Sequence, residues 1–191
     1  MQLETRESQP SERDPRPRAR THFFQARYWL RDLILSILLA LIFVFFIYQP
    51  VEVEGTSMAP SLESHERIFV NKFIYRFEPI RRGDIVVFRY PLNPSKIFIK
   101  RVIGLPGDRV AIRDGRVFID GQRLAEPYLP PSYFGEGNDA TVSVPPHQYY
   151  VLGDHRDDSD DSRDWGTVER KYIYGKAVFV YWPLSQIGFL N

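Results

Sequence analysis

Apolar residues follow one another without a break in one part of the chain and alternate with polar residues in most of the rest. The unbroken stretch, LILSILLALIFVFFIY, has no charged residue in 16 positions. Extended back to Tyr28 it covers 21 residues, or about 31 Å as a helix, which matches a hydrocarbon core of about 30 Å. We therefore predict a membrane-spanning helix over residues 28–48, ended by Pro50.

A cleavable signal peptide is the rival interpretation of this stretch. Its apolar part would be shorter, and a cleavage site with small residues would follow it. The sequence YQPVEVEG that comes next contains no such site. Tyr28, Trp29 and Tyr48 at the two ends are typical of the aromatic belts at a membrane interface. We therefore predict an anchor that stays in the mature protein.

Arginine is concentrated before the anchor, with seven among residues 1–32. Positive charge beside a span favours the cytoplasmic side, so we expect the N-terminus in the cytoplasm and the C-terminal part outside the cell membrane. Proline, serine and charged residues dominate residues 1–27, a composition typical of disorder. The predicted organisation is a disordered tail, 1–27, an anchor, 28–48, and an extracytoplasmic domain, 49–191.

Beyond the anchor, short stretches rich in β-branched and aromatic residues predict strands. They are RIFVNKF, DIVVFRY, KIFIKRVIG, RVAIRD, RVFIDG, QYYVLGD and KAVFVYWP. Asp114-Gly115 and Asp120-Gly121 predict tight turns between strands, and residues 104–108 predict another. Residues 125–147, rich in Pro, Gly and Ser, predict an irregular segment. The fold class is mainly β: one transmembrane helix, then an all-β domain of twisted antiparallel sheets.

Composition narrows the chemistry. The chain has no cysteine, which excludes a disulfide scaffold, a thiol nucleophile and thiolate metal sites. Its net charge is +1, and no basic stripe interleaved with aromatic residues indicates nucleic-acid binding. The acidic run GDHRDDSDDSRDWG lacks the central Gly and terminal Glu of an EF-hand calcium loop. We expect no metal and no cofactor.

One serine lies in a segment with unusual local geometry, VEGTSMAPSL. Ser57 stands between Gly55 and Pro60, which fits a tight, exposed loop, and an ordinary turn serine is the plain alternative. A nucleophilic serine needs a base, either a histidine or a desolvated lysine. His155 and His65 are the candidate histidines.

Lys100 is the candidate lysine, because it lies inside the apolar stretch KIFIKRVIG. Alternation places Lys100 with Phe98 and Val102 on one face of the strand and Arg101 on the other. Both faces are mostly apolar, so one of the two cations must approach the interior, and the alternation does not say which. Burial can lower the pKa of a lysine by about 3 to 5 units and so make the amine neutral. An exposed lysine on an edge strand is the plain alternative.

Together these segments resemble bacterial type I signal peptidases (leader peptidases). GTSMAPSL is similar to the family's serine box, RRGDIVVF to a structural box, IKRVIGLPGD to the lysine box and GDHRDDSDDSRDWG to the last box. The four occur in the family's order behind an N-terminal anchor. The resemblance implies that Ser57 is the nucleophile and Lys100 the general base of a Ser-Lys dyad.

The resemblance implies further roles around the dyad. Ser159 would hydrogen-bond the lysine, and Asp161 and Arg163 would form a supporting ion pair, itself supported by Arg101. The backbone N–H of Ser57 would bind the oxyanion.

Two further features concern the oxyanion site and the apolar residues near Ser57. Gly55 stands where some family members carry a serine that helps to bind the oxyanion, so a second donor stays open. Four apolar residues, Met58, Ala59, Pro60 and Leu62, follow the anchor closely. We expect them to form an apolar rim next to the substrate and the membrane.

The implied function is the removal of N-terminal signal peptides from exported preproteins, with cleavage after a small-x-small sequence through an acyl-enzyme. Preproteins and membrane lipid are the expected partners. Two other classes stay open: a serine hydrolase with His155 or His65 as base, and a non-catalytic membrane-anchored module that binds a partner. A self-cleaving repressor-type protease would need a DNA-binding domain, where this chain has an apolar span.

Overall fold

The computed structural model describes residues 19–135 and 140–190. Contacts divide the chain into two compact units, Met1–Phe43 and Val44–Asn191. The disorder expected for residues 1–27 falls, for positions 1–18, outside the described residues. From Ala19 on the chain is helical, inside the segment that was expected to be disordered. The last proline before this helix is Pro17, and no helix-breaking residue follows it until Pro50.

Helix α1 runs from Ala19 to Ile47. Its residues Arg27–Ile47 form a stretch of 21 residues with a mean hydropathy of 2.6, long and apolar enough to cross a membrane. The helix ends one position before the predicted anchor does, because Tyr48 already pairs with Asn71 in the first strand. Pro50 lies within that strand, at the edge of a sheet, where a missing N–H is tolerated.

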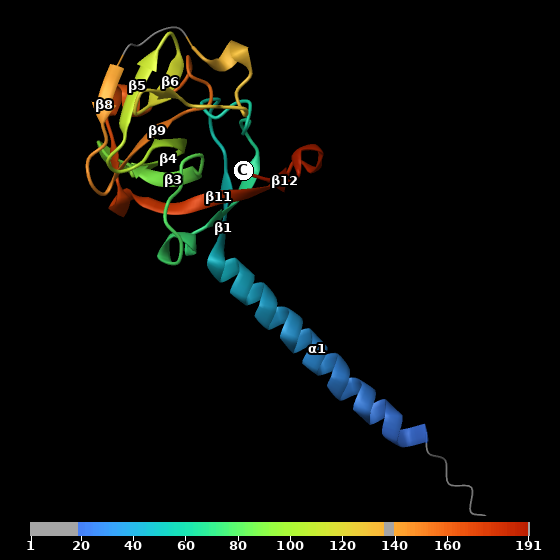
Figure 1. The fold of residues 1–191 in the computed structure, drawn as a ribbon. Coiled ribbons are helices and arrows are strands. Elements are labelled where there is room, and N and C mark those ends of the chain that lie inside the picture. The colour runs from blue at the N-terminus through green and yellow to red at the C-terminus, as the bar shows by residue number, and fades with distance from the viewer. Residues whose placement is uncertain (1–18, 136–139, 191) are drawn as a thin grey trace, which may run out of the picture. The chain divides into compact units, whose positions relative to one another are not determined.

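The second unit consists of two antiparallel sheets (Figure 1). The larger has eight strands in the order β1-β2-β11-β3-β4-β9-β10, with β12 paired to β11, and the smaller has four in the order β7-β6-β5-β8. The strands are β1 (Tyr48–Glu52), β2 (Arg67–Asn71), β3 (Ile85–Tyr90), β4 (Asn93–Gly104), β5 (Arg109–Arg113), β6 (Arg116–Ile119), β7 (Gln122–Arg123), β8 (Ala140–Ser143), β9 (Gln148–Leu152), β10 (Val168–Glu169), β11 (Ile173–Trp182) and β12 (Gly188–Phe189). A one-turn helix, α2, covers Ser162–Trp165. Single 3₁₀ turns cover Ile74–Arg76, Pro131–Tyr133, Arg170–Tyr172 and Leu184–Gln186.

The mainly β, antiparallel fold predicted from the sequence is confirmed, and each of the predicted stretches contains a strand. Asp114 and Gly115 join β5 to β6 with φ values of 47° and 68°, which is the left-handed conformation that a two-residue hairpin turn requires. The irregular segment predicted for residues 125–147 is partly wrong. Strand β8 lies within it and pairs with β5. This strand was not predicted because its four residues are too few to form a clear alternating pattern between the prolines and glycines.

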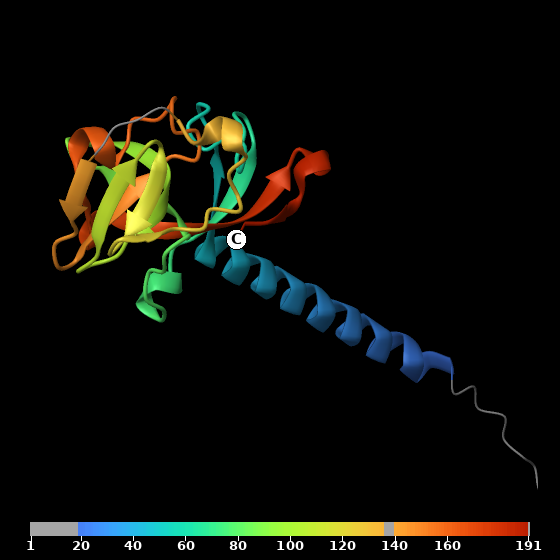
Figure 2. The ribbon, with the colours of Figure 1, turned by 45° about the horizontal axis from the view of Figure 1, so that its top comes forward.

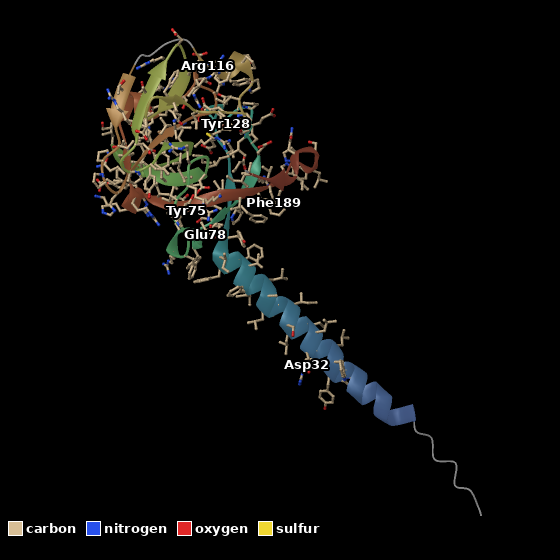
Figure 3. All side chains as sticks on the ribbon, in the orientation of Figure 1. Asp32, Tyr75, Glu78, Arg116, Tyr128 and Phe189 are labelled. Atoms are coloured by element: carbon tan, nitrogen blue, oxygen red, sulfur yellow. The ribbon has the colours of Figure 1, made fainter. Side chains whose placement is uncertain are left out.

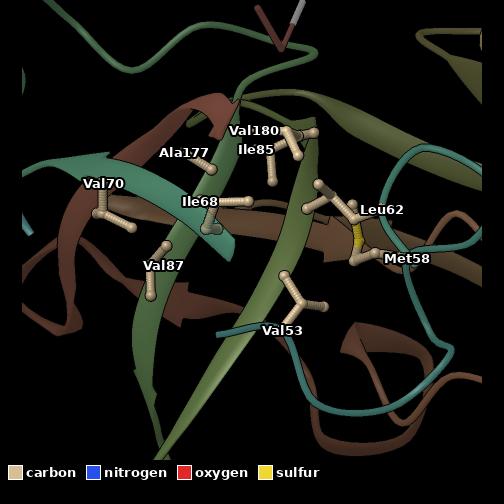
Figure 4. Packing of buried hydrophobic residues seen from close by; sticks show 9 residues of the cluster. All are labelled: Val53, Met58, Leu62, Ile68, Val70, Ile85, Val87, Ala177 and Val180. Carbon is tan, nitrogen blue, oxygen red and sulfur yellow. The ribbon is translucent and has the colours of Figure 1, made fainter. Parts of the chain in front are cut away.

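Apolar clusters cover both faces of the central strands. On β3, Val87 belongs to a cluster with residues of β2 and β11 (Figure 4), whereas Val86 and Phe88 belong to a second cluster on the other face. A third cluster joins the two sheets, with Ile103 of β4 packed near Val110 of β5. Side chains of β4 therefore enter the interior in either direction, which places polar residues of this strand in a dry environment.

The end of the chain forms a hairpin from β11 and β12, red in Figure 2, that projects from the rest of the β unit. It carries large exposed apolar side chains, including Phe189, labelled in Figure 3. The others are Trp182, Leu184 and Ile187, and all are at least half exposed. Such a group on a projecting hairpin is typical of a surface that contacts lipid or another protein.

Candidate active site

The loop that carries Ser57 connects β1 to β2 and is fixed by its own buried side chains. Gly55 adopts a φ of 88°, which an L-residue rarely takes. The N–H of Leu62 donates to the carbonyl of Met58 at 2.9 Å, and both side chains lie in the first apolar cluster. Ser57 itself is partly exposed. The loop thus presents one hydroxyl at the surface while its flank is anchored in the core.

Strand β4 brings Lys100 to this hydroxyl. Nζ of Lys100 donates a hydrogen bond to Oγ of Ser57 at 2.6 Å, across 43 positions of sequence. The lysine is only 4% exposed and has no carboxylate partner within hydrogen-bonding distance among the described residues. Of the two interpretations of this residue, the exposed edge-strand lysine is therefore wrong.

Burial lowers the pKa of Lys100 from its ordinary value of 10.5 to about 8, because the charged form loses its hydration. The nearby carboxylates of Asp161 and Asp160 act in the opposite direction and raise this pKa, whereas the Arg163 guanidinium lowers it further. At pH 8 about half of the amine is neutral. A neutral amine beside a hydroxyl can accept its proton.

Behind the lysine lies a buried ion pair from the acidic segment. Nε of Arg163 donates to Oδ1 of Asp161 at 2.8 Å, and Nη2 donates to Oδ2 at 2.9 Å, so the predicted pairing of these two residues is present. Asp161 is fully buried and also caps α2 by accepting from the backbone N–H of Arg163. Its Oδ2 accepts from the N–H of Gly153 at 3.0 Å. One carboxylate therefore fixes the segment that faces Ser57.

An open cleft of about 830 Å³ runs past Ser57 and Lys100. It is lined by β1, the segment 53–58, residues 95–100 of β4, Asp160 and Tyr174. Strand β1 is the edge of the larger sheet, and β4 pairs with β9 only from Arg101 onward. The cleft thus lies between two strand segments that each have one edge without a strand partner among the described residues. An extended peptide fits between such edges.

Comparison with known proteins identifies the family. The sequence profile described as "Signal peptidase, peptidase S26" matches residues 26–182. The chain belongs to this family. It is 42% identical to a signal peptidase I of Leptolyngbya laminosa, over 85% of this chain and 82% of that protein. It is 37% identical to the signal peptidase I T of Bacillus subtilis, over 83% and 86% of the two chains.

A solved structure of a signal peptidase I from Enterococcus faecalis aligns with a TM-score of 0.47 at 35% identity, over 52% of this chain and 97% of that one. The sequence matches alone carry the assignment. The protein is therefore a signal peptidase, a serine peptidase that removes signal peptides. The cleft beside Ser57 and Lys100 is the candidate active site of this signal peptidase.

The expected hydrogen bond between Ser159 and the lysine is not found in the signal peptidase. The hydroxyl of Ser159 donates instead to Oδ2 of Asp161 at 2.8 Å, and Lys100 donates to Ser57. Ser159 still lies at the site, since a Cβ added at Gly153 would meet both its Oγ and the carbonyl oxygen of Ser57.

Arg101, which was expected to support the Asp161–Arg163 pair, forms an ion pair with Asp154. Arg101 is 2% exposed, and its Nε and Nη2 donate to Asp154, with the shortest distance 2.7 Å. It also donates to the carbonyl of Gly83 at 2.9 Å and to Oγ of Ser61 at 3.1 Å. Both neighbouring cations of β4 are buried, because both faces of the strand are covered.

The apolar rim expected after Ser57 is not present. Met58 and Leu62 are 2% and 0% exposed and pack near Val53 and Ile85 (Figure 4). Of the four residues, Ala59 is partly exposed and only Pro60 is exposed. Met58 and Leu62 are four positions apart and project together into the core, where burial of such side chains gains about 1.5 to 3 kcal/mol each.

Neither candidate histidine acts on the hydroxyl in this arrangement. His65 is 82% exposed at its side chain and contacts Glu52. The ring of His155 packs edge-on against Tyr133 at 4.9 Å. It is the backbone N–H of His155 that donates to the carbonyl of Ser57, at 3.1 Å.

One feature of the site was not predicted from the sequence. Gly153 permits the close approach of the last segment to Ser57, and the preceding strand QYYVL with its Gly-Asp end was the available signal.

Within residues 19–135 and 140–190, no three or more His, Asp or Glu side chains come together in a way that could hold a metal ion.

Proposed function

We propose that this signal peptidase cleaves preproteins through a Ser57–Lys100 dyad. The observation that carries the proposal is the 2.6 Å contact between Nζ and Oγ, made by a lysine whose pKa burial lowers to about 8. A buried amine without a carboxylate partner is suited to the neutral form, and a neutral amine is a base. In this form the amine accepts the hydrogen bond that the hydroxyl donates.

The reaction takes place in two halves. Neutral Lys100 takes the Ser57 proton while Oγ bonds to the carbonyl carbon, and the lysine then gives that proton to the leaving amine as the C–N bond breaks. An ester between Ser57 and the signal peptide results. Lys100 next takes a proton from water, whose oxygen attacks the ester, and the lysine returns that proton to Oγ as the carboxylic acid leaves.

Neighbouring groups support these steps. The N–H of Ser57 donates to no group within the described residues, so it is available for the oxyanion that forms on the attacked carbonyl. Gly55, with no side chain, contributes no second donor. Asp161 holds Ser159 and Arg163 and thereby keeps the wall behind Lys100 fixed and dry.

The substrate lies extended in the cleft. Backbone groups of the signal peptide pair with the free edges of β1 and of residues 95–100 of β4, in the manner of an added strand. Alternate side chains then point into the cleft floor. Because Val53, Met58 and Ile99 fill this floor, only small side chains fit, which accounts for cleavage after a small-x-small sequence.

The membrane brings enzyme and substrate together. Helix α1 anchors the protein in the cell membrane, with the arginine-rich N-terminus in the cytoplasm and the catalytic unit outside. The exposed Trp182, Leu184, Ile187 and Phe189 of the C-terminal hairpin contact lipid. Protease added to the outside of spheroplasts is expected to digest the β unit and spare residues 1–32. Digestion of that tail from outside would contradict the orientation.

A cleavage assay on the full-length protein in detergent, with a preprotein as substrate, tests the mechanism. Wild type should release the mature protein, and His155→Ala should do so at a similar rate. Ser57→Ala and Lys100→Ala should reduce kcat by at least about 10³-fold, since dyad members act as a unit, with circular dichroism like that of wild type. Substantial turnover by Ser57→Ala, or loss of turnover in His155→Ala alone, would refute the dyad.

A further inference from the structure

A buried ion pair connects the last box to a segment that resembles none of the family's boxes. Nη2 of Arg156 pairs with Oε1 of Glu126, and the two side chains are 3% and 2% exposed. Glu126 belongs to the segment between β7 and the 3₁₀ turn at Pro131, far from the site in sequence. Burying two charges is costly, and an apolar pair of similar volume is often as stable. Stability alone therefore does not account for this pair.

Tyr128 connects the same segment to a second buried cation. Its hydroxyl donates to Oε1 of Glu126 at 2.9 Å, and Cζ of Arg101 lies 3.9 Å from the centre of its ring. Arg101 in turn holds Asp154. Figure 3 labels Tyr128 on the β unit. Glu126 thus contacts Arg156, and Tyr128 contacts Arg101. Both arginines bind the segment that follows β9.

That segment touches the serine loop directly. Nε of Arg156 donates to the carbonyl of Gly153 at 2.9 Å, while the N–H of His155 donates to the carbonyl of Ser57 at 3.1 Å. The carbonyl of Arg156 accepts from Nη2 of Arg163 at 2.6 Å. A chain of hydrogen bonds therefore runs from Glu126 through Arg156 to the turn at Gly153, and from that turn to the backbone of Ser57.

We propose that Glu126 and Tyr128 are positioning residues for the reaction: through Arg156 they hold the turn 153–156 against the Ser57 backbone and so set Oγ of Ser57 against Lys100. The inference rests on the proposed dyad. The rigid guanidinium of Arg156 binds Glu126 through Nη2 and the carbonyl of Gly153 through Nε, so it fixes the distance and direction between these two groups. Neither Glu126 nor Tyr128 lines the cleft, so both act only through others.

Positioning has a kinetic signature. A small displacement of a nucleophile costs up to about 100-fold in rate, whereas substrate binding in the cleft is unaffected. We expect Glu126→Gln to lower kcat by about 10- to 100-fold, with KM within about twofold of wild type. Tyr128→Phe removes only the hydroxyl bond and keeps the ring on Arg101, so kcat should fall about threefold.

The experiment compares full-length wild type, Glu126→Gln, Tyr128→Phe and Glu169→Gln in detergent with one preprotein. Glu169 is a matched control, because it forms an ion pair with Lys171 but is 49% exposed. Its variant should keep the wild-type kcat. The midpoint of the pH–rate profile should stay near that of wild type in all variants, since Lys100 remains buried, and near-UV circular dichroism measures the folded fraction under assay conditions.

The outcomes separate clearly. A lower kcat at constant KM and constant folded fraction supports the inference. If kcat of both variants equals that of Glu169→Gln, or if the loss follows the unfolded fraction, the inference is overturned while the dyad stands. Should Glu126→Gln fail to fold, Tyr128→Phe decides in the same way. A wild type that does not cleave overturns the proposed function, and this inference with it.

Discussion

Lys100 and Arg101 are consecutive in β4, lie on opposite faces of the sheet, and are 4% and 2% exposed. These two buried cations have different hydrogen-bond partners. Arg101 meets the carboxylate of Asp154 at 2.7 Å and keeps its charge, as a guanidinium must. Lys100 meets a hydroxyl instead, and its charge is disfavoured. One residue is a structural cation and its neighbour a potential base.

The Arg101–Asp154 pair makes a prediction about stability. Asp154→Asn removes the buried carboxylate that pairs with Arg101, so we expect the free energy of unfolding to fall by about 3 to 5 kcal/mol. Glu78→Gln is the control, because Glu78 pairs with Arg81 at the surface, where both are at least half exposed, and should change stability by less than about 1 kcal/mol. Urea unfolding followed by near-UV circular dichroism measures both. Equal stability of the two variants would contradict the assignment.

A second prediction concerns the close approach at Gly153. A Cβ at this position would collide with the carbonyl oxygen of Ser57 and with Oγ of Ser159. Gly153→Ala should therefore push the last segment away from the serine loop and lower kcat by at least about 100-fold. Gly121→Ala is the control for a turn glycine, since no atom lies within 4 Å of its added Cβ. Gly121→Ala should lower the free energy of unfolding and leave kcat unchanged. Wild-type kcat in Gly153→Ala would show that this contact is not required.

A third prediction uses the charges that act on Lys100. If its neutral form is the base, kcat/KM should rise with pH up to about 8 and then level off, following the pKa of about 8. The Asp160 carboxylate raises this pKa, so Asp160→Asn should shift the midpoint to lower pH. Glu169→Gln removes the same charge from a residue that does not act on Lys100 and should leave the midpoint in place. A shift to higher pH in Asp160→Asn would contradict the assignment.

The sequence predicted the strands because alternation and turn chemistry are local. Asp114-Gly115 determines its hairpin by itself, since both residues tolerate the left-handed conformation. Lys100 and Ser57 are 43 positions apart, and no spacing rule brings them together. Only the resemblance to a family did so. Local patterns therefore gave the fold class, while the candidate site depended on a whole set of motifs.

The errors have physical causes as well. Alternation along β4 separates Lys100 from Arg101 but says nothing about what covers each face, so the ion pair of Arg101 with Asp154 could not be predicted. Met58 was expected at the surface because it follows the anchor closely in sequence, yet its side chain enters the core. Glu126 could not be found, because its partner is Arg156, 30 positions away, and a glutamate between Ala and Pro looks exposed.

The last prediction tests the buried amine through stability. Lys100→Met keeps the length of the side chain and removes its charge. Folding lowers the pKa of Lys100 from 10.5 to about 8, so between these pH values the unfolded chain binds more protons than the folded one. The lysine therefore destabilises the fold, increasingly as pH falls from 10.5 to 8 and by a constant amount below that. The full penalty is about 3 kcal/mol, from about 1.4 kcal/mol per pKa unit.

We expect the Lys100→Met protein to be inactive and more stable than wild type by about 1 to 3 kcal/mol at pH 6 and at pH 7, since the lost bond to Ser57 and imperfect packing offset part of the gain. At pH 10 the difference should shrink to about 1 kcal/mol or less. Urea unfolding at these pH values, with cleavage measured on the same samples, checks both expectations. Lys96→Met is the control, because Lys96 is exposed and should show no pH-dependent gain. If Lys100→Met were clearly less stable than wild type at pH 6, the lysine would be a well-accommodated cation, and a different group would have to accept the Ser57 proton.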